Sequence, residues 1–264
     1  MLKAIIHGKL PTSVWNSEDV VTSSILGGFQ YLSNPEYVIK ALCSSFDINR
    51  KMLSFRIPIK KVRYVFWPSL KQCEPDVILV LTDVDDAIHI VGIEAKYMSP
   101  KSSEEDETVN VELRESWQRD QLSRELEDLN DSNTLKKLGI DCGNVNSTQL
   151  IYLTNHTVFP EKDIESGLKY SKAPVNNLYW MSWASLYEAT CMESQTEQDH
   201  IILSELQGVC ERKNLTRFNG WGKMSNVLPF NGFYSSGSTI IWPKKELNVT
   251  EWNYTQNDRG LING

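Results

Sequence analysis

Charged residues at one end of two apolar segments have the types and spacing that could do chemistry. The segments cover residues 74–81 and 88–96, and an acidic stretch over 83–87 joins them. Both are rich in β-branched and aliphatic residues, which predicts an antiparallel β-hairpin. Asp76, Glu94 and Lys96 belong to its open end. Ionised groups beside buried strands cost free energy unless something pairs with them, so this end is the candidate reactive site.

The hairpin register decides which of these side chains meet. A connection that is symmetric about Asp85 places Asp76 directly opposite Glu94. Facing residues of an antiparallel pair point to the same side, with Cβ atoms about 4.5–5.5 Å apart. Lys96, two residues beyond Glu94, points to that side too. A one-residue bulge would break this arrangement.

Two carboxylates this close predict a site for a hard divalent cation. Their repulsion raises one pKa unless a cation lies between them. Mg²⁺ accepts one or two carboxylates and is commonly completed by substrate phosphate, and we expect Mn²⁺ to substitute for it. A cation polarises a phosphoryl oxygen and lowers the pKa of water, while a neighbouring lysine offsets phosphate charge or helps to deprotonate water. This set of groups suits phosphodiester hydrolysis.

A helix upstream of the hairpin brings a third acid. It begins near residues 16–19, which carry helix-start signals, and is expected to continue to about Leu32. Glu18 lies three residues before Val21, the first residue of the apolar stripe, so it shares the inward face. The alternative is a first-turn acid that only favours the helix dipole.

A downstream helix is predicted over residues 111–130. Leu122, Leu126 and Leu129 form its apolar stripe, which is typical of an amphipathic helix. The adjacent polar stripe is Arg114, Gln118, Gln121 and Glu125. Gln121 either orients substrate or a water, or is a boundary glutamine of the helix, and the sequence favours neither.

Pro75-Asp76, followed eighteen residues after Asp76 by Glu94-Ala95-Lys96, resembles the PD-(D/E)xK nuclease superfamily. The resemblance implies a restriction-endonuclease-like fold in the α/β class. Its αβββαβ core would cover about residues 14–155, with a mixed central sheet flanked by helices. The nuclease-like domain would cover residues 1–215, and residues 216–264 would form an additional C-terminal α+β extension that is rich in aromatic residues.

The resemblance also implies roles for individual residues. Asp76 and Glu94 would be metal ligands, the Ala95 carbonyl a third ligand, and Lys96 the catalytic lysine. Glu18 would be an additional ligand or an acid behind the ligands. Gln121 is similar to a glutamine that some exonuclease-like members carry on this helix, but those members have tyrosine where this chain has Glu125.

Several further polar residues lie near the predicted site or hairpin in the sequence. Lys101 and Ser102 follow Lys96 and are predicted to touch DNA phosphate, within an acidic loop over 100–110 that is predicted to be mobile and solvated. His156 follows a predicted strand and is a weaker candidate for the site. His89 alternates with apolar residues, which favours a structural role. The aspartates at 83, 85 and 86 lack the glycine and glutamate of a calcium loop, so they are predicted to be turn residues.

The rest of the chain supplies a larger set of predicted elements. They are an apolar strand or arm at Ala4–His7, helices over 35–48 and 200–213, and strands over 51–67, 149–154, 178–183 and 238–242. The 200–213 helix is expected to bury Ile201, Ile202, Leu206 and Val209. Two similar tetrapeptides, 218–221 and 230–233, are predicted to be structural turns.

Net charge, cysteine spacing and the length of apolar runs argue against several classes of protein. The net charge of −7 over 264 residues argues against tight nonspecific nucleic-acid binding, since phosphate contacts dominate such affinity. Five scattered cysteines lack zinc spacing, and buried, reduced thiols are expected in the cytoplasm. No apolar run approaches the roughly 20 residues that span a bilayer. A soluble, cytoplasmic protein is the expectation.

The resemblance, together with the acids and lysine of the hairpin, implies a Mg²⁺-dependent endonuclease that cleaves DNA in a prokaryotic restriction or antiviral defence system. It would act as a homodimer or with a partner protein. One alternative is a nuclease-fold subunit that is inactive alone and receives DNA from a translocating or sensing partner. Another is a non-catalytic binding protein of the same fold.

Overall fold

The computed structural model describes residues 2–11, 14, 17–110, 113–174, 177–217, 234–236 and 239–241. The chain divides into two compact units, Met1–Arg217 and Phe218–Gly264. In the second unit, β6 (Tyr234–Ser236) pairs in antiparallel fashion with β7 (Thr239–Ile241), which overlaps the strand predicted over 238–242. The two tetrapeptides predicted to be turns lie outside the described residues.

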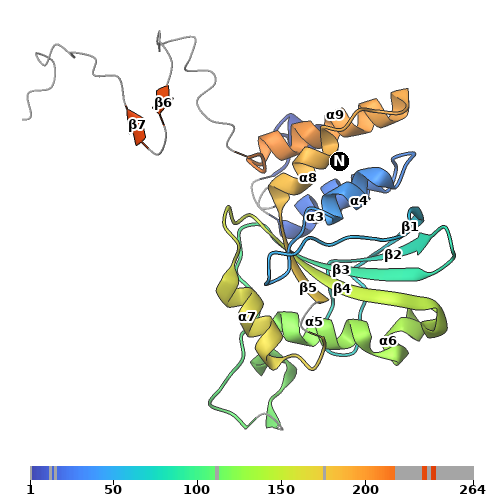
Figure 1. The fold of residues 1–264 in the computed structure, drawn as a ribbon, viewed down its shortest axis with the longest axis vertical. Coiled ribbons are helices and arrows are strands. Elements are labelled where there is room, and N and C mark those ends of the chain that lie inside the picture. Colours follow the sequence, from blue (N-terminus) through green and yellow to red (C-terminus); the bar gives the residue numbers. More distant parts are fainter. Residues whose placement is uncertain are drawn as a thin grey trace, which may run out of the picture. The chain divides into compact units, whose positions relative to one another are not determined.

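The first unit is built on one mixed sheet of five strands in the order β1-β2-β3-β4-β5 (Figure 1). Pairing is antiparallel from β1 to β3 and parallel from β3 to β5. The α/β class with a mixed sheet flanked by helices is therefore confirmed. The strands are β1 (Ile59–Phe66), β2 (Val77–Asp83), β3 (Ile88–Lys96), β4 (Val145–Thr154) and β5 (Leu178–Ser182).

Helices cover both faces of this sheet (Figure 1). One face carries α3 (Glu18–Phe29), α4 (Glu36–Leu42), α8 (Trp183–Thr190) and α9 (Glu197–Arg212), with α1 (Leu2–Ile6) packed on α9. The other face carries α5 (Gln121–Asn130), α6 (Ser132–Lys137) and α7 (Glu161–Tyr170). Because both faces are covered, β2 and β3 are buried along almost their whole length, as their continuous aliphatic runs require.

Strand alternation assigns the polar residues of the hairpin to one face. Val91, Ile93 and Ala95 of β3 belong to the core beneath α3, and Ile90 belongs to the core beneath α5. Glu94 shares the parity of Ile90, so it faces α5. Gly92 lies on the same side, where an added Cβ would fall 2.5 Å from a Leu129 methyl carbon of α5. This glycine lets α5 approach the sheet closely.

The predicted hairpin register is confirmed. Val77 pairs with Ile93 and Thr82 with Ile88, without a bulge between them. The upstream helix and the strands over 149–154 and 178–183 are also confirmed, although α3 ends at Phe29 and β4 begins at Val145.

The predicted N-terminal strand is wrong, because Ala4 to Ile6 belong to α1. Ile5 is fully buried in the core beneath α3, and Ile6 packs on α9 beside Gly208. The sequence offers only a short run of adjacent apolar residues here, and such a run alone does not distinguish a helix from a strand.

The downstream helix begins ten residues later than predicted. Its N-cap is Asp120, whose side chain accepts a hydrogen bond from the Ser123 amide, a role that aspartate performs well. Arg114 therefore lies outside α5, and Gln118 lies in a short 3₁₀ helix, Ser116–Gln118. Of the residues predicted for the polar stripe, Gln121 and Glu125 are the two that lie on α5.

The acidic stretch after β3 is not simply solvated, contrary to prediction. Glu105 accepts a hydrogen bond from the Asp120 amide at 2.8 Å and forms an ion pair with Arg114 at 2.5 Å. These two side chains are only 3% and 5% exposed. The stretch is tied to the start of α5 because its acids satisfy donors there.

Other boundaries also changed. The helix predicted over 35–48 ends at Leu42, and the strand predicted over 51–67 is ordered as a strand only from Ile59. Ile201 of α9 is 46% exposed rather than buried, while Leu206 and Val209 are buried as predicted. Helices α6 and α7 were not anticipated. Among the described residues, no helix is long and apolar enough to cross a membrane.

Candidate active site

The open end of the β2–β3 hairpin brings Asp76 beside β3. Asp76 immediately precedes β2, and its carbonyl accepts a hydrogen bond from the Trp67 amide at 2.9 Å. Its side chain turns across to β3, where Oδ2 accepts the Ala95 amide at 2.8 Å. Asp76 and Glu94 are both buried, at 8% and 3% exposure. The backbone of the hairpin therefore holds two buried acids side by side.

Lys96 lies between two acids from different elements. Its Nζ is 2.7 Å from Glu94 Oε1 and 3.3 Å from Glu18 Oε1. Burial would lower the pKa of Lys96, but the charge of Glu94 and then that of Glu18 outweigh it, so the pKa is raised. The ammonium therefore stays protonated in this arrangement, where it compensates the charge of the two acids.

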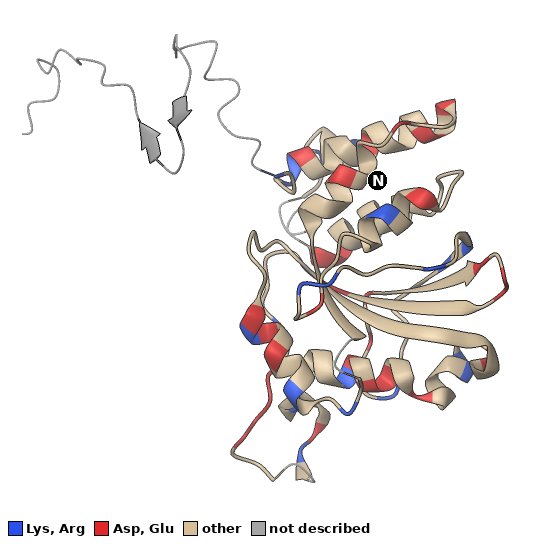
Figure 2. Cartoon of the chain, in the orientation of Figure 1, with Lys and Arg blue, Asp and Glu red and all other residues tan. Residues whose placement is uncertain are grey.

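Glu18 reaches the site from the opposite face of the sheet. It is the first residue of α3, and its Oε2 accepts the Tyr97 amide at 2.8 Å and the Ser99 hydroxyl at 2.7 Å. Figure 2 shows acidic colour at the start of α3, whose first turn carries Glu18 and Asp19. The inward direction predicted for Glu18 is confirmed, and its partners are the backbone and side chains that follow β3.

Helix α5 completes the polar cluster. Gln121 Nε2 donates to Glu94 Oε1 through a short hydrogen bond and to Glu125 Oε1 at 3.1 Å. The side-chain oxygen of Gln121, Oε1, accepts a hydrogen bond from the Ser102 amide at 2.8 Å. Gln121 thus fixes Glu94 and links it to the loop after β3. Gln121 therefore lies within the polar cluster.

Glu125 is a buried acid that the sequence reasoning did not include in the site. It is 1% exposed, and its Oε2 accepts no hydrogen bond from any donor among the described residues. Its position four residues after Gln121 places both side chains on one face of α5. That spacing was the available signal, because the two residues occupy the polar stripe beside the leucines.

The acids outnumber the cation at this site. Four carboxyl groups, on Glu18, Asp76, Glu94 and Glu125, surround the one ammonium of Lys96. Burial and then the charge of Glu94 raise the pKa of Asp76 to about 7. Burial likewise raises the pKa values of Glu94 and Glu125, the latter well above its ordinary value. The site therefore carries uncompensated negative potential, which an added cation would relieve.

The donor chemistry fits a hard divalent cation. Carboxylate oxygens of Asp76, Glu94 and Glu18 are the ligands that Mg²⁺ and Mn²⁺ prefer. Within the described part of the chain, however, no three His, Cys, Asp or Glu side chains converge closely enough to form a ready metal cluster. The ammonium of Lys96 instead contacts two of the three donors.

The two predicted phosphate contacts have internal roles in the structure. Lys101 Nζ pairs with Asp120 Oδ2 at 2.5 Å, and the lysine side chain is only 3% exposed. Asp120, a fully buried residue, also accepts the Ser166 hydroxyl at 2.9 Å. Ser102 is exposed, but its amide is bound by Gln121. These contacts anchor the loop after β3 to α5 and α7.

A cavity of about 480 Å³ opens beside Lys96. It lies at the carboxyl ends of β3 and β4, the two parallel central strands. Tyr152 and Thr154 of β4, His156 after β4, and Asp163 of α7 contribute to its wall. The remaining lining residues follow β3 or β4 in the chain: Tyr97, Met98, Ser99, Pro100 and Asn155.

His89 and Asp83 have structural roles, as predicted. His89 Nδ1 lies 2.7 Å from the Ser147 hydroxyl, and its Nε2 lies 3.3 Å from Asp83 Oδ2. Asp83 Oδ1 accepts the amides of Asp85 and Ala87, both at 2.9 Å. These contacts close the far end of the hairpin.

Comparisons with protein-family models, curated proteins and solved structures found no match to this chain.

Proposed function

We propose that the protein is a divalent-metal-dependent nuclease that hydrolyses phosphodiester bonds in DNA. The carrying observation is the group of Asp76, Glu94 and Lys96 at one end of the hairpin. The acids are buried and like-charged, and the lysine is held by ion pairs beside a cavity. Such groups are costly to the fold, so a catalytic use accounts for their presence.

The order of the elements supports the same proposal. Helix α3, strands β1 to β3, helix α5 and strand β4 occur in the order α-β-β-β-α-β, with α4 inserted after α3 and α6 inserted after α5. That order agrees with the restriction-endonuclease-like core implied by the resemblance to the PD-(D/E)xK nucleases. We infer that this fold type underlies the α/β architecture.

The residues of the site have distinct tasks in this proposal. Asp76 and Glu94 would hold the cation, with Glu18 and the Ala95 carbonyl as further oxygen donors. When bound, a divalent cation polarises the phosphoryl oxygen and lowers the pKa of water. The Ala95 amide fixes the Asp76 carboxylate, and Gln121 fixes that of Glu94. The protonated Lys96 would offset the negative charge that develops on the phosphate in the transition state.

The deciding experiment is DNA cleavage by the purified full chain on circular and linear substrates. Mg²⁺ or Mn²⁺ should support cleavage, and EDTA should abolish it. Glu94→Gln keeps the shape of the side chain and should lose activity, whereas Asp85→Asn in the distant turn should retain it. Equal cleavage by both variants would overturn the assignment of the site. Circular substrate separates endonuclease from exonuclease activity.

A second candidate is a subunit that cuts only with a partner. The Lys96 ammonium contacts both Glu94 and Glu18, so cation binding must compete with these ion pairs. The net charge of −7 also disfavours unaided DNA binding. DNA would then be delivered by a partner in a prokaryotic restriction or antiviral system, or the chain would act as a homodimer. Light scattering after size-exclusion chromatography, with and without DNA and Mn²⁺, distinguishes a dimer from a monomer that awaits a partner.

A further inference from the structure

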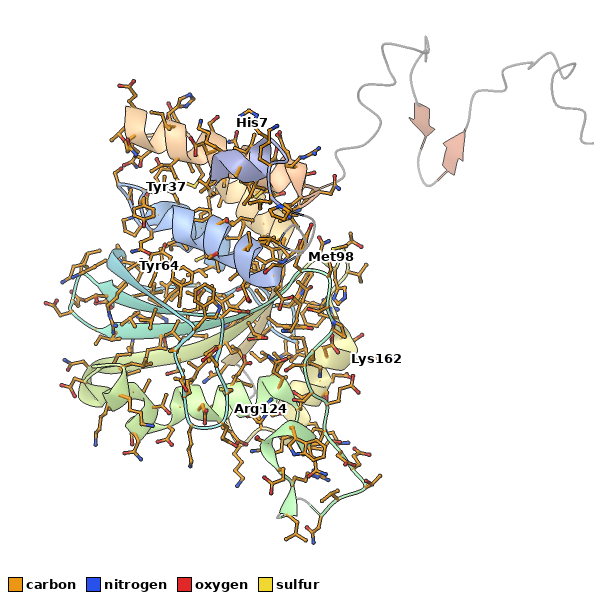
Figure 3. The ribbon with its side chains drawn as sticks, turned by 180° about the vertical axis from the view of Figure 1, so that it is seen from behind. His7, Tyr37, Tyr64, Met98, Arg124 and Lys162 are labelled. Atoms are coloured by element: carbon orange, nitrogen blue, oxygen red, sulfur yellow. The ribbon has the colours of Figure 1, made fainter. Side chains whose placement is uncertain are left out.

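The cavity beside Lys96 has a second wall that the proposed metal site does not use. Lys96 contributes from the end of β3, and His156 contributes from the loop after β4. Figure 3 shows Met98 at this edge of the molecule, and Lys162, the neighbour of Asp163, near the same edge. The volume of about 480 Å³ is in the range of small-molecule sites, so a nucleotide unit of a DNA strand fits its size.

Most titratable side chains that line the cavity already have partners. Lys96 pairs with Glu94 at 2.7 Å, and the Tyr97 hydroxyl donates to the Lys213 carbonyl at 3.2 Å. Burial and then the charge of Asp163 raise the pKa of the Tyr152 hydroxyl, and the Asp163 carboxylate lies 3.8 Å from Lys101 Nζ. A partnered group gives up or takes a proton only by breaking its contact.

His156 differs from these groups. Its amide donates to the Thr154 hydroxyl at 3.2 Å, but no hydrogen bond or ion pair to its ring is found among the described residues. The residue is exposed at the cavity wall. Imidazole is the side chain that ordinarily exchanges a proton near neutral pH. Of the titratable groups described in this wall, His156 is the one whose side chain has no hydrogen bond or ion pair.

The loop that carries His156 is anchored on both sides. Before it, the Thr154 hydroxyl accepts a hydrogen bond from Trp180 Nε1 at 2.8 Å. After it, Phe159 packs edge-on against Trp180, and the Arg50 guanidinium lies 3.8 Å from the centre of the Phe159 ring. These contacts fix the loop backbone and leave the imidazole in the wall of the cavity.

We propose that His156 is a further catalytic residue, the general acid that protonates the leaving oxygen of the phosphodiester. This inference rests on the proposed nuclease function. It assigns the cavity to the nucleotide on the leaving-group side of the scissile phosphate. Lys96 from the end of β3 and His156 from the loop after β4 then face the reacting phosphate, which separates the stabilisation of phosphate charge from the delivery of a proton.

The proposed hydrolysis conserves atoms and charge. A water oxygen forms a bond to phosphorus, and its proton passes to solvent. The bond from phosphorus to the sugar oxygen breaks, and that oxygen keeps the electron pair. The imidazolium of His156 gives its proton to this oxygen, which leaves as a hydroxyl, and the neutral ring regains a proton from solvent.

A bridging phosphorothiolate tests this role directly. In these substrates a sulfur replaces the 3′ or the 5′ bridging oxygen, and a thiolate leaves without help because its pKa is about 8.5. With ordinary DNA and Mn²⁺, His156→Ala should reduce the cleavage rate by about 10²–10⁴-fold, the usual contribution of general acid catalysis. With sulfur at the leaving position, the same variant should cleave within a few-fold of the unaltered chain.

The matched control is His200→Ala, a substitution of an exposed histidine on α9, which should leave both rates unchanged. An equal loss for His156→Ala on both substrates would overturn the general-acid role, and so would no loss on either. If the unaltered chain cleaves neither substrate, the proposed function fails and this inference fails with it.

A second measurement does not depend on turnover. The ring resonances of His156 should shift in NMR spectra when a short DNA duplex is added in EDTA, and those of His200 should not. A His156 ring that is unaffected by saturating DNA would also overturn the proposal, because a general acid must touch its substrate.

Discussion

Strand β2 has an aspartate at each end, and the two are used in opposite ways. Asp83 at the closed end is fully buried and receives hydrogen bonds from two amides, with His89 beside it. Burial would raise the pKa of Asp83, but the bond from the Ala87 amide and then that from His89 outweigh it, so the pKa is lowered. Asp76 at the open end is 8% exposed, and its pKa is raised to about 7.

The difference lies in the neighbours rather than in the degree of burial. Asp83 is surrounded by donors, whereas Asp76 has one amide donor and faces the carboxylates of Glu94 and Glu18. A carboxylate that receives several hydrogen bonds strengthens a turn. A carboxylate that is left facing like charges weakens the fold unless something else binds there. The same residue type on one strand thus distinguishes a structural end from a candidate functional end.

The largest expected effect is on catalysis. Asp76→Asn keeps an oxygen that can accept the Ala95 amide but removes the charge, so DNA cleavage should fall by about 10³-fold. Asp83→Asn makes the same chemical change at the other end of β2 and should cleave within a few-fold of the unaltered chain. Single-turnover rates on plasmid DNA measure both. Equal losses would show that the two ends are not functionally distinct.

The second-largest expected effect is on cation binding, which should depend on Asp76 and not on Asp83. A ligand that binds only the folded state stabilises it by about 2.7 kcal/mol at 100 times its Kd. Mn²⁺ should therefore raise the Tm of the unaltered chain and of Asp83→Asn. The Tm of Asp76→Asn should not respond. Calorimetric titration with Mn²⁺ alone provides the affinity, and a full response in Asp76→Asn would remove Asp76 from the ligand set.

In the absence of a divalent cation the two ends should have opposite effects on stability. The folded-state pKa of Asp76, about 7, exceeds its ordinary value of 3.8, so the unaltered chain loses stability as the pH rises from about 4 to 7. Asp76→Asn avoids this loss. It should be more stable by about 2 kcal/mol at pH 8, since each pKa unit corresponds to about 1.4 kcal/mol and relaxation of the chain reduces the total. At pH 4 its advantage should be small.

Urea titrations at pH 4 and pH 8 measure this difference in the free energy of unfolding, and Asp83→Asn is the control. Because the pKa of Asp83 is lowered, its contribution to stability is present above its ordinary pKa and disappears only as the pH falls. The substitution should therefore lower the free energy of unfolding across pH 5–8. A pH-independent effect of Asp76→Asn would contradict the raised pKa of Asp76.

The sequence was sufficient to predict at which end of the hairpin the reactive groups gather. Strand alternation and a symmetric turn predicted the register that places Asp76 beside β3, and helical phase predicted that Glu18 points inward. Both depend on local periodicity. The start of α5 was predicted too early because residues 111–118 continue the helical pattern. The helix begins after its N-cap, Asp120, whose side chain is bound by Lys101 and Ser166 from other elements.

Glu125 was missed for a related reason. Its spacing from Gln121 was visible in the sequence, but its burial depends on how closely α5 approaches the sheet. That approach is permitted by Gly92 of β3, which is far from Glu125 in the sequence and leaves room for Leu129. Tertiary packing of this kind leaves no periodic signal.

The smallest expected effect is at Glu125. Burial, and then the charge of Glu94, raises its pKa well above the ordinary value, which favours the protonated, uncharged form of the side chain. Glu125→Gln is neutral and nearly isosteric, and it keeps the oxygen that accepts from Gln121. It should change the free energy of unfolding by less than about 0.5 kcal/mol, as substitutions that preserve contacts usually do. Glu125→Leu removes that acceptor and should cost about 1–3 kcal/mol. Urea denaturation at pH 7.5 measures both. If Glu125→Gln instead abolished cleavage as Glu94→Gln should, Glu125 would be ionised in the working enzyme and would belong with Asp76 among the groups that hold the cation.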